Sequence, residues 1–221
     1  MSQPVHDVNG RKVRVAVLDY EIGNLRSAQK ALEHVGATAR LTADPAEIAA
    51  ADAAVLPGVG NFGACMDALD ATGLAEQSRL VAGSGRPFLG ICVGMQLLYE
   101  GSEETPGRDG LGLLPGMVRQ LPEGVKRPQM QWNQLQSQQN PGATSHPLLQ
   151  GLNGAWMYFV HSFAAGPGPE VIATVDYGGP VTAAAAKDNV WATQFHPEKS
   201  ADAGMQLLSN WVAWVASVTS S

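Results

Sequence analysis

The sequence has 221 residues, a formal net charge of −6 and 45% hydrophobic residues. This length suffices for one well-buried domain, and the acidic balance argues against nucleic acid or an anionic membrane surface as the main partner. Residues 1–12 lack the apolar core of a signal peptide, and no apolar stretch approaches bilayer-spanning length. The two cysteines, Cys65 and Cys92, make no disulfide framework, so we expect a soluble protein in the reducing cytoplasm.

The first half of the chain alternates between strand and helix patterns after a loose tail at 1–11. Buried-strand patterns lie at 13–18, 38–41, 52–56 and 87–91. Helical patterns lie between and after them, at 24–35 with Asn24 as N-cap, from Asp44-Pro45 onward, over 63–83 and from Met95. This alternation predicts an α/β fold with a doubly wound, mostly parallel sheet, in which 13–18 is the first and central strand.

The composition changes near residue 101. Residues 101–150 are rich in Gly, Pro, Gln and Asn, which indicates loops and an antiparallel extension of the first sheet. Further strand patterns lie at 117–121, 125–130, 155–160, 171–175, 181–186 and 190–195, and a helix with an apolar core-facing stripe covers 201–217. We expect 12–221 to form a single domain.

Cys92 lies in a segment that has the pattern of a nucleophile elbow. Residues 90–94 read Gly-Ile-Cys-Val-Gly between a strand and a helix pattern, with cysteine in the place of serine. Small neighbours permit the strained turn, and the following helix would direct its N–H groups and positive dipole end at the sulfur. The N–H of Val93 would then face an oxyanion. The alternative is that Cys92 is a small buried hydrophobe, as most free cysteines are.

A glycine-rich loop follows the strand pattern at 52–56. Residues 58–63 (GVGNFG) match the dinucleotide pattern G-x-G-x-x-G, but the next strand ends at Cys92 and not at the acidic residue that would hold a ribose. The loop is therefore either a plain tight turn or part of the site, because the carboxyl ends of parallel strands share one rim. In the second case the N–H of Val59 would be a second oxyanion donor.

A histidine and a glutamate follow the strand pattern at 190–195. Residues two apart on an extended segment point the same way, so His196 would reach Cys92 while Glu198 orients its imidazole. The alternative is a surface histidine with an incidental glutamate. A cysteine, a base and an orienting acid are what nucleophilic acyl transfer requires, so the combination favours a triad. His161 is another base candidate, but we expect it in a strand-end loop that lines the pocket.

Three motifs, LPGVGNFG at 56–63, GICVGMQLL at 90–98 and QFHPEKS at 194–200, together resemble those of the class I glutamine amidotransferases. DYEIGNLRS at 19–27 and YFVHSF at 158–163 add to the match. The PGVG loop, the DY-x-x-GN-L start and the HPEKS ending narrow the resemblance to the glutaminase subunits of imidazole glycerol phosphate synthases. The resemblance implies a flavodoxin-like sheet and hydrolysis of L-glutamine to glutamate and ammonia. It also implies a heterodimer with a (β/α)8-barrel cyclase, which uses the channelled ammonia to form imidazole glycerol phosphate and AICAR in histidine biosynthesis.

The resemblance assigns roles by position. Cys92 would attack the side-chain amide of glutamine, His196 would deprotonate the thiol and protonate the departing ammonia, and Glu198 would hold His196. The glutamine would be bound by Gly60, Gln96, His161 and Ser162. The partner interface or channel mouth would contain Asn24 and Lys199. No pair of histidines or cysteines has metal-ligand spacing, so we expect no metal and no cofactor.

The chain departs from the family pattern at three positions. Glu21 stands where the family commonly has glycine, and Gln129 and Gln131 replace the histidine and glycine of the family's Pro-His-Met-Gly-Trp-Asn. These departures affect the expected loop geometry and partner interface, because glycine permits backbone conformations that other residues do not. Two alternatives remain. One is an amidotransferase of another pathway, such as those of vitamin B6 or anthranilate, against which the PGVG loop and the DYEIGN start argue. The other is a catalytically degenerate assembly partner, against which the intact triad argues.

Overall fold

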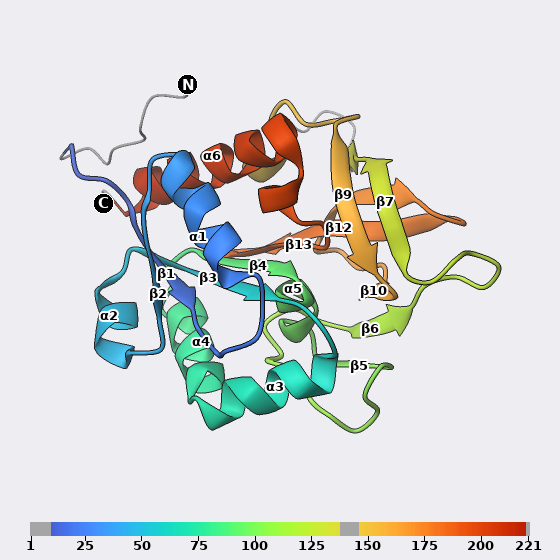
Figure 1. Ribbon diagram of the computed structural model, residues 1–221, viewed down its shortest axis with the longest axis horizontal. Coiled ribbons are helices and arrows are strands. Elements are labelled where there is room, and N and C mark those ends of the chain that lie inside the picture. The colour runs from blue at the N-terminus through green and yellow to red at the C-terminus, as the bar shows by residue number, and fades with distance from the viewer. Residues whose placement is uncertain (1–9, 138–145, 220–221) are drawn as a thin grey trace.

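The computed structural model describes residues 10–137 and 146–219, so residues 1–9 of the predicted tail lie outside the described residues. One eight-stranded sheet runs through the molecule (Figure 1). In spatial order its strands are β2 (Thr38–Thr42), β1 (Arg14–Leu18), β3 (Ala53–Gly58), β4 (Phe88–Cys92), β13 (Val190–Thr193), β12 (Pro180–Lys187), β11 (Val171–Asp176) and β8 (Gln136–Ser137).

The strands from β2 to β13 are parallel to one another, whereas β12, β11 and β8 pair antiparallel to their neighbours. The predicted doubly wound sheet with an antiparallel extension is confirmed. The prediction that the first strand is central is wrong, because the chain places β2 outside β1 and β3 inside it. The sheet then grows only on the β3 side, which leaves β1 second from the edge.

Helices cover both faces of the sheet, with α1 and α6 on one side and α2, α3 and α4 on the other (Figure 1). Their bounds are α1 (Leu25–His34), α2 (Pro45–Ala50), α3 (Phe62–Ala71), α4 (Leu74–Gly83), α5 (Val93–Leu97) and α6 (Ala201–Val218), and two 3₁₀ helices are η1 (Pro147–Leu149) and η2 (Pro197–Lys199). The single helix predicted over 63–83 is two helices. Gly73 has φ 72°, a left-handed conformation that an α-helix cannot contain, and the chain turns there.

Two smaller sheets flank the end of the molecule that carries β12 and β13 (Figure 1). One consists of β10 (Phe163–Ala165), β6 (Met117–Gln120) and β5 (Gly101–Ser102), and the other of β7 (Gln129–Gln134) paired antiparallel with β9 (Trp156–His161). The strand predicted at 125–130 begins only at Gln129, after Pro128, which has no N–H to donate to a ladder. Within the described ranges, no helix is both long and apolar enough to cross a membrane.

The turn from β4 into α5 brings that short helix close to β3. Cys92 has φ 57°, in the left-handed region that residues with a side chain rarely adopt. Gly94 follows in α5, where a Cβ would collide with the carbonyl oxygen of Leu56 in β3. The predicted tight strand-to-helix turn at Cys92 is confirmed, and the glycine after it is required by contact with backbone.

We expect Gly94→Ala to lower the free energy of unfolding by about 3 kcal/mol, because the added methyl group meets backbone that cannot rotate away. Urea denaturation of the purified chain measures this. Gly83→Ala is the matched control. Gly83 is exposed at the end of α4 with open space around it, so alanine there should be neutral or stabilise by up to about 1 kcal/mol. Equal stability of the two variants would contradict the close approach.

Candidate active site

A pocket of about 260 Å³ lies where β3 and β4 end, and it joins segments that are far apart in the sequence. The β4–α5 turn contributes Cys92, Val93 and Gln96, and the loop after β3 contributes Val59 and Gly60. The β9–β10 connection contributes His161 and Ser162, and His196 enters after β13. The structure thus brings together eight of the residues predicted from sequence. Glu104 and Pro128 also line the pocket. Pro128 begins the segment that was compared with the family's Pro-His-Met-Gly-Trp-Asn, whereas no local sequence signal indicated Glu104.

The Cys92 sulfur is the reactive atom of this pocket. Cys92 is almost completely buried, yet it lines the hollow at the turn from β4 into α5, where its backbone has φ 57°. Two side chains approach the sulfur: His196, which lines the same pocket and whose pKa Cys92 raises, and Gln194, whose Nε2 lies 3.9 Å from it. The reading of Cys92 as an inert core residue does not fit these contacts.

Glu198 holds the imidazole of His196 in place. His196 Nδ1 lies 2.7 Å from Glu198 Oε1, and both side chains are only 3% exposed, which leaves Nε2 to face the sulfur. The expected extended geometry is wrong at Glu198. Pro197 begins the 3₁₀ turn η2, and that turn brings the carboxylate back to the imidazole. The backbone of His196 is fixed as well, because its N–H donates to the carbonyl oxygen of Tyr158 in β9 at 3.0 Å.

The electrostatic surroundings of His196 favour the imidazolium. Burial of the ring opposes its charge, but hydrogen bonds to Cys92 and Glu198 and the charges of those two groups outweigh burial. Together they raise the pKa of His196 to about 9. His196 therefore holds a proton beside the sulfur at neutral pH.

His161 has the opposite character. It is the last residue of β9 and lines the pocket, as predicted, and burial lowers its pKa to about 4. Its Nδ1 lies 2.8 Å from the carbonyl oxygen of Phe163, which can only accept, so Nδ1 carries the hydrogen. Nε2 is then an acceptor, and among the described residues this buried atom has no hydrogen-bond partner. His161 is a neutral acceptor and not the base for Cys92.

Two glutamines connect this region with the sulfur. Gln96 Nε2 donates to the carbonyl oxygen of Phe163 at 2.8 Å and to Gln194 Oε1 at 3.1 Å. Gln194 was missed as a site residue. The only sequence signal was its place as the first letter of the QFHPEKS motif, and a local pattern does not reveal a contact with Cys92, which is 102 positions away.

The two predicted oxyanion donors both line the pocket. Val93 is the first residue of α5, where a backbone N–H has no acceptor within its own helix. Val59 follows β3, and its carbonyl oxygen accepts a hydrogen bond from the Cys65 thiol of α3 at 3.3 Å. Cys65 is buried in α3, and the contact ties that helix to the loop.

The two predicted interface residues lie outside the pocket lining. Asn24 is partly buried immediately before α1, and its Oδ1 accepts a hydrogen bond from Ser27 Oγ instead of capping the helix with its side chain. Lys199 is exposed at the end of η2, one residue after Glu198.

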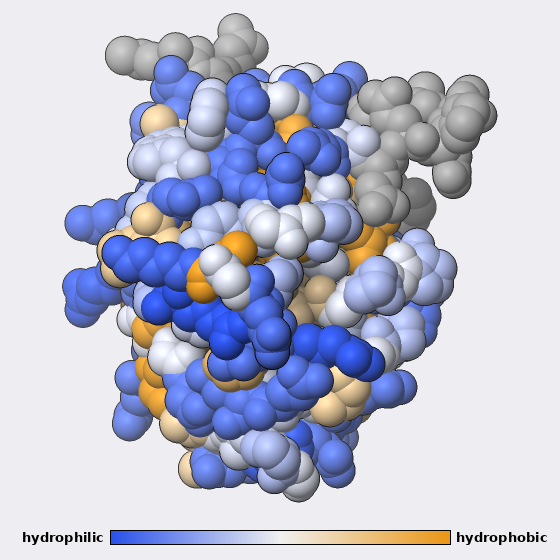
Figure 2. Space-filling model, turned by 90° about the vertical axis from the view of Figure 1, so that its right-hand side faces the viewer, coloured by the Kyte–Doolittle hydropathy of each residue, from blue (hydrophilic) through white to orange (hydrophobic). Residues whose placement is uncertain are grey.

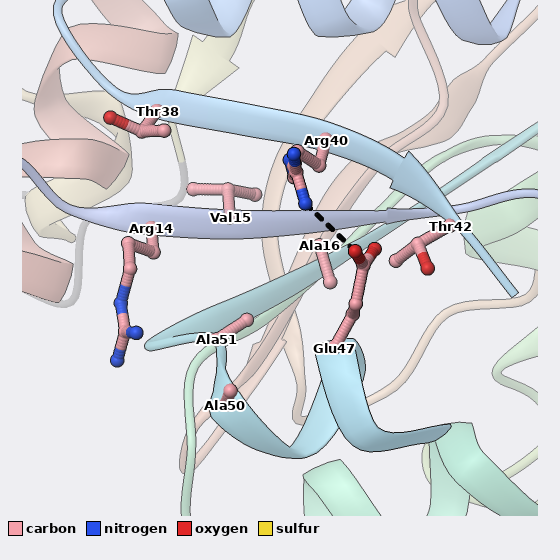
Figure 3. Close-up of a pocket in the computed structure, with 9 residues that line it drawn as sticks. All are labelled: Arg14, Val15, Ala16, Thr38, Arg40, Thr42, Glu47, Ala50 and Ala51. Atoms are coloured by element: carbon pink, nitrogen blue, oxygen red, sulfur yellow. Dashed lines mark hydrogen bonds and ion pairs between the residues drawn. The ribbon is translucent and has the colours of Figure 1, made fainter. Parts of the chain in front are cut away.

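Another hollow, of about 290 Å³, lies between α2 and the strands β1 and β2 (Figure 3). Figure 3 shows Arg40 of β2 directed at Glu47 of α2, and the two are 2.7 Å apart. No cysteine or histidine lines this hollow, and β1 and β3 separate its outer strand from β4. The pocket at Cys92 is therefore the candidate active site.

Residues 16–214 match the family described as "Glutamine amidotransferase class-I". The chain is 52% identical to the imidazole glycerol phosphate synthase subunit HisH of Synechococcus elongatus, over 92% of this chain and 94% of the relative. It is 48% identical to the HisH subunit of Methanothermobacter thermautotrophicus, over 90% and 97% of the two chains.

Solved structures agree on the fold. A crystal structure of a glutamine amidotransferase matches with a TM-score of 0.71 at 20% identity, covering 91% of this chain and 98% of that one. The structure of PurLQS from Thermotoga maritima matches with a TM-score of 0.65 at 19% identity, over 94% and 98%. By its family match and its sequence relatives, the chain belongs to the class I glutamine amidotransferases and, among them, to the HisH subunits of imidazole glycerol phosphate synthase.

Proposed function

We propose that this chain hydrolyses L-glutamine to L-glutamate and ammonia as the glutaminase subunit of imidazole glycerol phosphate synthase in histidine biosynthesis. The observation that carries the proposal is that His196 shares one pocket with Cys92 while its Nδ1 lies 2.7 Å from the Glu198 carboxylate. The relatives named HisH support the pathway. The intact triad disfavours a degenerate assembly partner, and the identity of these relatives disfavours an amidotransferase of another pathway.

In the proposed reaction His196 holds the proton that the Cys92 thiol has given up, and the thiolate attacks the side-chain amide carbon of glutamine. The N–H groups of Val59 and Val93 hold the resulting oxyanion. His196 then donates its proton to the leaving nitrogen, and ammonia departs from a glutamyl thioester. His196 next takes a proton from water, which attacks the thioester, and glutamate leaves as the proton returns to the sulfur.

Substrate recognition in this proposal follows from the polarity of the pocket. The free Nε2 of His161 is an acceptor, as is the side-chain oxygen of Gln96, so both suit the α-ammonium group of glutamine. Gly60 and Ser162 offer N–H and hydroxyl donors that suit its α-carboxylate.

We place the function in one domain over 12–221 and the protein in the cytoplasm. Cys65 and Cys92 are both free thiols, and a thiol nucleophile is maintained in a reducing compartment. The proposed mechanism uses neither a metal nor another cofactor.

A partner surface lies beside the pocket. Met130, Trp132 and Trp156 are 63%, 43% and 54% exposed, and the register of β7 with β9 puts them on one face. Pro128 and Val160, at one end of this face, line the pocket. Figure 2 shows this end of the molecule, where separate apolar areas interrupt a largely hydrophilic surface. We assign the face to the cyclase barrel in a heterodimer, with Asn24 and Lys199 at its border, so that ammonia passes directly from the pocket to the partner.

We expect Cys92→Ala to abolish glutamine hydrolysis while the chain still folds and binds the cyclase, because only the nucleophile is removed. Glutamate release, measured with the cyclase and its ribonucleotide ligand present, tests this. Circular dichroism and size-exclusion chromatography of the complex are the controls for folding and assembly. Substantial glutamine hydrolysis by Cys92→Ala would refute the mechanism.

We expect Glu198→Gln to lower kcat by about 10²–10⁴-fold, because the imidazole loses its orientation and its charge partner. A pKa raised from 6.5 to about 9 stabilises the fold fully below pH 6.5, and this stabilisation is lost as the pH rises towards 9. The free energy of unfolding should therefore fall over this window more steeply in the wild type than in Glu198→Gln.

Glu47→Gln is the matched control for this prediction, since Glu47 forms only an exposed ion pair with Arg40. It should leave kcat and the pH dependence unchanged. Identical pH profiles of wild type and Glu198→Gln would exclude the assigned role of Glu198.

We expect Trp132→Ala to weaken cyclase binding at least ~30-fold, as truncation of an exposed aromatic anchor at an interface does, with glutaminase activity of the isolated chain unchanged. Titration calorimetry with the cyclase measures the affinity. Leu80→Ala is the control, because Leu80 is also exposed, at 52%, but lies on α4. Equal affinity of both variants would move the interface elsewhere.

A further inference from the structure

We propose that Gln194 is a catalytic residue that donates a hydrogen bond to the Cys92 sulfur and so stabilises and directs its thiolate. The inference rests on the proposed glutaminase function and adds a donor to the triad. Gln194 Nε2 lies 3.9 Å from Cys92 Sγ, within the range of a hydrogen bond to sulfur, and Gln194 is completely buried.

The contacts of Gln96 with Phe163 and with Gln194 determine the direction of this hydrogen bond. The carbonyl oxygen of Phe163 can only accept, so the atom of Gln96 that faces it must be the NH₂ group. The second hydrogen of that NH₂ group points at Gln194, where the facing atom must be the oxygen. The NH₂ group of Gln194 is then left for Cys92. Turning the Gln194 amide over would place two NH₂ groups against each other and an oxygen against the sulfur.

The backbone holds Gln194 in this position. It directly follows β13, the neighbour of β4, and its N–H donates to the carbonyl oxygen of Ala183 in β12 at 2.8 Å. Two residues later the same segment presents His196 to the same sulfur. One short stretch of chain thus places beside Cys92 both the histidine that holds the proton and a neutral donor, and no rearrangement is needed for them to act together.

A neutral donor helps at the two points of the reaction where sulfur carries negative charge. It stabilises the thiolate before attack on glutamine, and it stabilises the sulfur again when water has added to the thioester and the C–S bond breaks. Gln194 neither gains nor loses a proton in either step. Its contribution should therefore appear in kcat and in the reactivity of the thiol, with little change in KM for glutamine.

The test compares Gln194→Met, which keeps the length of the side chain but lacks the donor, with the wild type. Iodoacetamide alkylation of Cys92 is followed between pH 5 and 9 by peptide mass spectrometry, which separates Cys92 from Cys65. The pH of half-maximal rate should rise by about one unit or more, the effect of losing one hydrogen bond to a charged group, and kcat should fall roughly tenfold or more. The titratable groups whose charge acts on Cys92 stay unchanged: His196 with Glu198 behind it, Cys65 of α3 and Tyr20 after β1.

Gln206→Met is the matched control, because Gln206 is exposed on α6, and both readouts should match the wild type. Gln194→Glu, nearly identical in shape, should also raise the half-maximal pH, and it decides the case if the methionine variant does not fold. Folded variants whose alkylation profile coincides with that of the wild type would overturn the proposal. If the wild-type chain is alkylated normally but releases no glutamate with the cyclase, the glutaminase function is refuted instead. The alkylation comparison would still test the role of Gln194.

Discussion

The close approach of α5 to β3 is the constraint on which the site depends. A helix can start directly after β4 only if the chain reverses at Cys92 in a left-handed conformation, which costs about 1–3 kcal/mol for a residue with a side chain. β4 lies between β3 and β13 and is buried along its whole length, so the sheet can hold this strain. The result is that Cys92 lines the pocket at the carboxyl end of β4, where other segments can reach its sulfur.

The order of the strands then determines which groups reach that sulfur. β13 pairs with β4, so residues that follow β13 emerge beside Cys92, and these are Gln194 and His196. β9 lies over the same segment and fixes the backbone of His196 through Tyr158. The antiparallel extension of the sheet is therefore not an accessory to the parallel part, because it holds in place the segment that carries the base and the donor, which the elbow itself lacks.

Local patterns were enough to predict the elbow, the alternation of strands and helices and the pairing of His196 with Glu198, since each depends on residues close in sequence. They failed where the outcome depends on a backbone conformation or a distant contact. The left-handed Gly73 divides one expected helix into two, and the turn η2 replaces the expected extended segment at Glu198. Gln194 was not predicted because its role depends on the backbone carbonyl oxygen of Phe163, which orients it through Gln96. Such a contact cannot be inferred from the identities of the side chains.

The two histidines of the pocket are both buried, yet they have opposite roles. At His161 the Phe163 carbonyl oxygen fixes the tautomer by accepting from Nδ1, but burial outweighs this hydrogen bond and lowers the pKa of the ring to about 4. His196 is buried as well, but it bonds to a carboxylate and a thiol, so its pKa rises to about 9. The positive charge of His196 further lowers the pKa of His161, which keeps the proton on the residue beside the sulfur. Burial lowers the pKa of both rings, so it does not assign their roles. The roles follow from the hydrogen-bond partners, which are a backbone carbonyl oxygen at His161 and the Glu198 carboxylate at His196.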